Sequence, residues 1–227
     1  MQAGLAADQL PTLPNLTGDH NRVMHLASKP FGIPTLATPS LVLEATRVRR
    51  NIERLAGYAV SHGLAVRPHA KTHKTVALAR LQLTAGARGM TVAKVGEAEA
   101  LLPAFDGDAD VLVAYPTVDP ARTQRLAVLA RDATVRVSLD CVTAIEAVAA
   151  AAQAEGVTVG VLADLDVGMG RTGVPTAEAL VALAQAVTAV RGLRLDGILC
   201  YPGHIWTKPA GLIRWFLMQR LLDAAAA

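Results

Sequence analysis

The chain has 227 residues, of which 52% are hydrophobic and 18% charged, and 22 basic against 19 acidic side chains give a formal net charge of +3. This length suits one globular domain, such as an α/β barrel of about 200–250 residues. The composition excludes a disordered or collagen-like chain. Aromatic residues make up only 4% and no run of Lys or Arg is dense, so a nucleic-acid partner is not expected.

Nothing in the sequence predicts secretion or a membrane partner. The first residues lack the basic start and apolar run of a signal peptide, and no stretch reaches the roughly 18 uninterrupted apolar residues of a membrane span. Two cysteines, Cys141 and Cys200, are too few for a disulfide scaffold. We therefore expect a cytoplasmic protein.

The N-terminal part of the chain predicts an irregular arm and then a first strand and helix. Residues 1–37 form the arm, because four prolines interrupt it. Residues 40–43 predict a short strand. A helix follows from about Ala45 to His62, and Gly63 ends it as a left-handed cap.

After Gly63, short apolar runs alternate with Ala- and Leu-rich segments of helical spacing. The runs predict strands at 64–67, 90–93, 111–114, 135–139, 157–165 and 195–199, and the segments predict helices at 76–84, 96–102, 120–131, 142–155 and 176–191. This alternation is typical of parallel βαβ units, and runs that are apolar almost throughout are typical of strands covered on both faces. An open doubly wound sheet and a closed barrel both fit the pattern. Residues 212–222 predict one more amphipathic helix, so the chain supplies about six of the eight units of a full barrel.

Candidate functional residues follow the predicted strands, where chemistry concentrates in parallel α/β folds. The first strand end reads RPHAKTHK, with Arg67, His69 and Lys71 on one face. Burial and neighbouring cations would favour the neutral amine of Lys71, the form that attacks a carbonyl to make a Schiff base. A surface loop with solvated lysines is the alternative. A zinc pair of His69 and His73 is not favoured, because no third ligand is near in sequence.

The strand at 157–165 leads into a glycine-rich loop. Gly168, Gly170 and Gly173 match the dinucleotide pattern G-x-G-x-x-G. That pattern belongs to the first βα turn of its fold, whereas several units precede this loop. The carboxylates of Asp164 and Asp166, on one face of the strand, would also repel a pyrophosphate. Arg171 suits an anchor for an anionic oxygen better.

The last predicted strand ends in CYPGH at residues 200–204. Tyr201 and Gly203 share one face, and His204 begins the next loop. Tyr201 could hydrogen-bond a ligand nitrogen, or it could be an aromatic side chain that covers the rim of the barrel.

Together these strand ends resemble those of the fold-type III pyridoxal-phosphate (PLP) enzymes, within them the D-threonine aldolase/D-serine dehydratase group. The string PHAKTHK at 68–74 is the signature of that group, whereas DVGMGRTG at 166–173 is shared more widely, including with alanine racemases. The resemblance runs from about Thr38 to Trp206 and implies a TIM-type (β/α) barrel of the alanine racemase N-terminal type. Residues 38–227 would form this PLP-binding barrel domain.

The resemblance also implies a role for each matching residue. Lys71 would be the catalytic lysine that holds the cofactor as an internal aldimine. Arg171 would donate to the phenolic oxygen of the cofactor, and Tyr201 would face its ring nitrogen. The remaining cofactor-binding candidates are His69, Gly203 and His204.

By this resemblance the chain is a PLP-dependent lyase that acts on a D-β-hydroxy-α-amino acid, with D-threonine aldolase favoured by the YPGH string. D-serine dehydratase-type elimination and a non-catalytic PLP homeostasis protein are the alternatives. In the family a C-terminal β domain and a divalent metal, Mn or Zn, complete the site, and a complete chain could form a homodimer. Neither that domain nor the metal ligands are recognisable before Ala227. We therefore expect a barrel truncated before its last strands, and a poor catalyst by itself.

Overall fold

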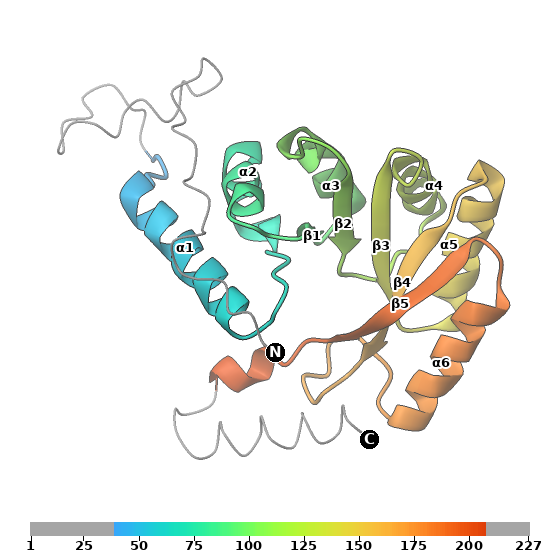
Figure 1. Ribbon diagram of the computed structural model, residues 1–227. Helices are drawn as coiled ribbons and strands as arrows, with labels where there is room; N and C mark the ends of the chain where they lie inside the picture. The colour runs from blue at the N-terminus through green and yellow to red at the C-terminus, as the bar shows by residue number, and fades with distance from the viewer. Residues whose placement is uncertain (1–38, 208–227) are drawn as a thin grey trace, which may run out of the picture.

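A computed structural model describes residues 39–207, which form one parallel sheet and the helices that cover it (Figure 1). The strands pair in sequence order: β1 (Met90–Val92), β2 (Ala109–Val113), β3 (Ala133–Leu139), β4 (Val159–Leu165) and β5 (Leu193–Cys200). The helices are α1 (Ala45–Ser61), α2 (Val76–Thr84), α3 (Val95–Leu101), α4 (Pro120–Leu129), α5 (Val142–Glu155) and α6 (Ala177–Ala189). Consecutive parallel strands with a helix in each connection are the βα units of the barrel that the sequence predicts.

The hydrophobic core lies between the outer face of the sheet and the helices around it (Figure 1). Alternate residues of β3 (Val135, Val137 and Leu139) are buried, as are Val159 and Val161 of β4. Each such side chain contributes about 1.5–3 kcal/mol when it is removed from water. On α5, Ile145 and Val148 meet this layer, since helical spacing puts them on one face.

The inner face of the sheet is only partly apolar, whereas the sequence predicts strands that are hydrophobic on both faces. It carries a chain of ion pairs that runs across four elements: Arg67–Asp110 at 2.5 Å, Asp110–Arg136 at 2.6 Å, Arg136–Asp196 at 2.7 Å and Asp196–Arg194 at 2.6 Å. Two neighbouring glycines leave room for these side chains. A Cβ at Gly89 would lie 2.5 Å from Nη1 of Arg67, and one at Gly160 would lie 2.9 Å from Cγ of Arg136.

Two predicted strands are wrong. Residues 40–43 form no strand and Leu41 is 89% exposed, because no strand within residues 39–207 pairs with them. Residues 64–67 are extended but make only a partial ladder with the chain before β1. The N–H of Arg88 donates to the carbonyl of Val66 at 2.8 Å. In a parallel ladder the N–H of residue 68 would donate the next hydrogen bond, to the carbonyl of Arg88, but Pro68 has no N–H.

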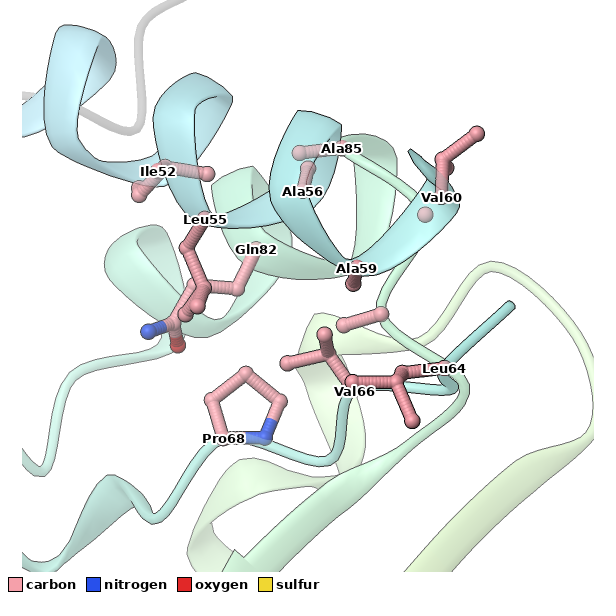
Figure 2. Close-up of a pocket in the computed structure, with 12 residues that line it drawn as sticks. Ile52, Leu55, Ala56, Ala59, Val60, Leu64, Val66, Pro68, Gln82 and Ala85 are labelled. Carbon is pink, nitrogen blue, oxygen red and sulfur yellow. The ribbon is translucent and has the colours of Figure 1, made fainter. Parts of the chain in front are cut away.

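Helix α1 begins and ends close to the predicted positions. The side chain of Glu44 caps it by accepting from the N–H of Arg47, and Gly63 follows it at φ +65°. A pocket of about 80 Å³ lies between α1, α2 and the extended segment, with apolar side chains such as Leu55, Leu64 and Val66 turned toward it (Figure 2). Because ligand pockets measure about 300–1,000 Å³, this gap belongs to the packing and not to a binding site.

No helix within residues 39–207 has the length and apolar character to cross a membrane. The predicted arm (1–37) and the predicted helix at 212–222 lie outside the described residues.

Candidate functional site

The segment that carries Lys71 is anchored to β1 and then turns sharply. The N–H of Thr91 donates to the carbonyl of Pro68 at 2.8 Å, and the hydroxyl of Thr91 donates to the carbonyl of Arg67 at 3.1 Å. A 3₁₀ turn at Ala70–Thr72 follows, and Nδ1 of His69 accepts from the N–H of Lys71 at 3.3 Å. Ala70 is fully buried, whereas the side chain of Lys71 is exposed. The turn therefore presents the amine at the edge of the sheet.

The structure brings Lys71, Arg171 and Tyr201 together although they follow three separate segments, namely residues 64–67, β4 and β5. Nζ of Lys71 lies 6.0 Å from the centroid of the Tyr201 ring, and Cζ of Arg171 lies at the same distance from it. Both cations are within the range of attraction to an aromatic face. An amine, a guanidinium and a phenol thus share one small region at the carboxyl ends of the strands.

The glycine-rich loop before Arg171 is folded around its own carboxylate. Oδ1 of Asp166 accepts the N–H groups of Gly168, Met169 and Gly170 at 2.9 to 3.0 Å. These hydrogen bonds hold the pKa of Asp166 below its usual value, and the hydrogen bond from Gly170 makes the largest contribution. The N–H groups that would cradle a pyrophosphate are already used, which gives a structural reason to reject the dinucleotide pattern. In the sequence, Asp166 indicates only repulsion of an anion; its role in shaping the loop depends on the fold of residues 166–170.

Gly203 and His204 lie against this cluster. A Cβ at Gly203 would come within 2.6 Å of the Tyr201 ring and 2.9 Å of Sδ of Met169. A Cβ at Gly168 would lie 3.6 Å from Nε2 of His204, so the imidazole rests on the glycine loop. Both candidates are therefore neighbours of Tyr201 and of the loop that carries Arg171.

Gly173 closes the loop at a point where no side chain fits. Its φ is +101°, and an added Cβ would lie 2.6 Å from the carbonyl carbon of Leu165. We expect Gly173→Ala to lower the free energy of unfolding by about 3 kcal/mol or more, because a backbone clash adds to the strain of a positive φ. Gly170→Ala is the matched control: it also has a positive φ (+68°) but nothing within 4 Å, so about 1–2 kcal/mol is expected. Urea unfolding measures both, and equal losses would show that the close approach carries no cost.

The two histidines of the signature string have separate environments. Burial lowers the pKa of His69, and the charges of Lys71 and Arg171 lower it further while Glu97 opposes them. His73 instead pairs with Gln82 at 3.2 Å on α2, and its pKa is lowered by burial. Within residues 39–207 no three His, Cys, Asp or Glu side chains come together to hold a metal. His69 therefore belongs to the Lys71 cluster, and His73 anchors the turn to α2.

A buried carboxyl group lies beneath the site. Asp164, at the end of β4, is 1% exposed and accepts from Oγ of Ser138 at 3.0 Å. Burial raises its pKa; the neighbouring carboxylates of Asp140 and Asp166 act in the same direction, and hydrogen bonds from Thr172 and Ser138 oppose them.

This raised pKa predicts a pH-dependent effect of Asp164→Asn. A carboxyl group whose pKa is higher in the folded state stabilises the fold below its unfolded pKa, and that contribution is lost as the pH rises through the folded pKa. Asparagine does not ionise and can still accept from Ser138. We therefore expect Asp164→Asn to increase the free energy of unfolding relative to wild type at about pH 8, with a smaller difference near about pH 3. Urea titrations at both pH values test this, with the exposed Asp132→Asn as control; a gain that does not change with pH would contradict it.

Comparisons with known proteins identify the family of this chain. The model of the family "Alanine racemase, N-terminal domain" matches residues 43–226. The chain is 41% identical over 171 residues to 3-hydroxy-D-aspartate aldolase from Paracoccus denitrificans, and 34% identical over 170 residues to D-threo-3-hydroxyaspartate dehydratase from Delftia sp. (strain HT23), each alignment covering 74% of this chain and 44% of the relative. The crystal structure of D-threonine aldolase from Filomicrobium marinum superimposes with a TM-score of 0.80 at 33% identity over 84% of this chain and 51% of that one.

The chain thus spans about half the length of these relatives. The family model covers most of the chain, and it agrees with the resemblance drawn from the strings at 68–74 and 166–173. Pyridoxal phosphate is the cofactor of these enzymes. The chain therefore belongs to the alanine racemase N-terminal domain family, the barrel of the fold-type III pyridoxal-phosphate enzymes.

Proposed function

We propose that this chain provides the pyridoxal-phosphate site of a lyase that acts on D-3-hydroxy-α-amino acids. The observation that carries the proposal is the position of Lys71 and Arg171, each 6.0 Å from the ring centre of Tyr201. Relatives at 34–41% identity are named as an aldolase and a dehydratase for such substrates, which supports the reaction class.

The side chains of the cluster fit the functional groups of this cofactor. Lys71 supplies the primary amine that would hold the aldehyde carbon covalently. The Arg171 guanidinium would donate to the phenolic oxygen, a charge-assisted hydrogen bond. The Tyr201 hydroxyl would meet the ring nitrogen. When bound, the cofactor supplies an electron sink for the bond that breaks at Cα of the substrate.

Neighbouring residues would hold these three groups in place. The N–H of Lys71 is tied to Nδ1 of His69, which restricts the turn that carries the amine. The Asp166 carboxylate fixes the loop before Arg171, so the guanidinium starts from a rigid backbone. Gly203 leaves space for the Tyr201 ring, which a larger residue would displace.

Of the two lyase reactions, we favour retro-aldol cleavage. In that reaction the β-hydroxyl loses a proton, the Cα–Cβ bond breaks, Cα gains a proton, and glycine and an aldehyde leave. Support comes from the higher identity to the aldolase, 41% against 34% for the dehydratase, and from the YPGH string at 201–204. The dehydratase likeness makes elimination the second candidate, with loss of the hydroxyl group and release of ammonia.

One assay distinguishes the two reactions. The chain is incubated with pyridoxal phosphate, Mn²⁺ and either D-threonine or D-threo-3-hydroxyaspartate, and glycine, aldehyde and ammonia are measured. Equal amounts of glycine and aldehyde support the aldolase proposal, whereas ammonia with a 2-oxo acid supports the dehydratase. The L-enantiomers and Lys71→Ala are the controls. Turnover that persists in Lys71→Ala would contradict the assignment of this site.

A further inference from the structure

A large pocket with a strongly cationic wall opens beside the Lys71 cluster. It has a volume of about 740 Å³ and lies at the carboxyl ends of β1 and β2, between the segments that lead into α3 and α4. This size is within the range of small-molecule sites. The charged residues in its wall are five cations and one carboxylate: Lys74, Lys94, Arg122, Arg125, Arg171 and Glu97.

Two of the cations are neutralised by partners, and the carboxylate is engaged. Nζ of Lys74 lies 3.1 Å from Oε1 of Glu97, whose other oxygen accepts from the N–H of Ala93 at 2.9 Å. Arg125 forms an ion pair with Glu99. A negative ligand would therefore meet little repulsion from this wall.

The other cations keep their charge available. Within residues 39–207, Lys94, Arg122 and Arg171 form no ion pair. Lys94 and Arg122 are exposed side chains at the mouth of the pocket, on the segments before α3 and at the start of α4. Concave sites lined by one sign of charge focus the field and attract ions of the opposite sign.

Arg171 belongs both to this pocket and to the Tyr201 cluster. Ala70, the residue before Lys71, also lines the pocket, so the pocket adjoins the turn that carries the amine. A ligand that occupies the Lys71 cluster can therefore extend past Arg171 toward Lys94 and Arg122.

We propose that Lys94 and Arg122 bind a carboxylate on the side chain of the substrate, so that the site prefers 3-hydroxyaspartate-type diacids to D-threonine. This inference rests on the proposed lyase function and adds the charge of the substrate side chain to it. The planar guanidinium of Arg122 can donate two parallel hydrogen bonds to a carboxylate, and the ammonium of Lys94 can donate a further one. The methyl group of D-threonine makes neither contact.

Binding without cofactor or turnover tests the pocket directly. Calorimetry compares succinate, a diacid, with butyrate, its monoacid counterpart, on the wild-type chain and on the Lys94→Gln/Arg122→Gln variant. We expect succinate to bind about tenfold more tightly than butyrate in wild type, with the preference lost in the double variant. Succinate binding to wild type should also weaken when the salt concentration rises from about 50 to about 300 mM, because salt screens the charges. Arg88→Gln removes an exposed cation that does not line the pocket and should keep the preference.

Equal affinities in wild type, undetectable succinate binding or a preference that survives in the double variant would each overturn the proposal. Turnover supplies a second readout. The ratio of kcat/KM for D-threo-3-hydroxyaspartate to that for D-threonine should fall about tenfold in the double variant. Because the chain by itself is expected to be a poor catalyst, a lack of turnover in every variant leaves the decision to the calorimetry, which shows whether the pocket selects a second carboxylate. Labelling of Lys71 by the cofactor tests the lyase site separately.

Discussion

Lys71→Ala is expected to abolish covalent attachment of pyridoxal phosphate to the chain. After incubation with the cofactor and reduction with borohydride, wild type should carry the label on the peptide that contains Lys71. The variant should carry none, because it lacks the amine that lies 6.0 Å from the centre of the Tyr201 ring in wild type, beside Arg171. Peptide mass spectrometry locates the label, and the absorbance of the bound cofactor gives an independent signal.

Lys74→Ala is the matched control for this experiment. Lys74 is three residues away in the same string, but its ammonium is paired with Glu97 at 3.1 Å. An amine held as an ammonium by a carboxylate is a poor nucleophile. Labelling should therefore survive in Lys74→Ala largely unchanged. A label that maps to Lys74 or to Lys94 would show that the cofactor binds a different lysine.

Asp110→Ala is expected to cause a large loss of stability. The Asp110 carboxylate binds both nitrogens of Arg67, at 2.5 and 3.1 Å, and Nη1 of Arg136 at 2.6 Å. All three side chains are less than one-fifth exposed. Without Asp110, Arg67 loses its ion-pair partner and Arg136 keeps only Asp196. Removing one member of a buried pair costs about 3–5 kcal/mol, and partial exposure reduces this to about 2–4 kcal/mol.

Glu99→Ala is the control for an exposed pair of the same kind. Glu99 binds Arg125 on the surface, where solvent screens the charges, so its removal should cost about 0.5 kcal/mol or less. Urea unfolding of both variants gives the comparison. Similar losses in the two variants would show that the inner chain of charges is no more important than a surface ion pair.

Asp110→Ala should also loosen the segment that carries Lys71. Arg67 lies four residues before Lys71, and the backbone of this segment makes few hydrogen bonds to the rest of the sheet. The pair with Asp110 is therefore one of its main anchors. Faster hydrogen exchange at the N–H of Thr91, which donates to Pro68, is the expected sign of this loosening.

Much of the fold could be predicted from the sequence because it depends on local periodicity. The predicted helices at 76–84 and 142–155 agree with α2 and α5 residue for residue, and the five strands of the sheet lie within two residues of their predicted positions. Apolar spacing and caps act within one element, so they can be recognised without knowing its neighbours. The candidate site residues could be proposed for a related reason: parallel segments end at one edge, and the strings that follow residues 64–67, β4 and β5 contain Lys71, Arg171 and Tyr201.

Tertiary structure decided what depends on a partner distant in sequence. The apolar residues at 40–43 form no strand because a strand needs hydrogen bonds from a neighbour, which residues 39–207 do not supply. Arg67, Asp110 and Asp196 gave no sign of a shared ion-pair chain, since only the strand register brings them together on the inner face. The cationic pocket likewise needs Lys94, Arg122 and Arg171 from three separate connections. Periodicity in the sequence determined which elements form, and the packing of those elements determined which charges meet, because electrostatic attraction depends on separation in space and not along the chain.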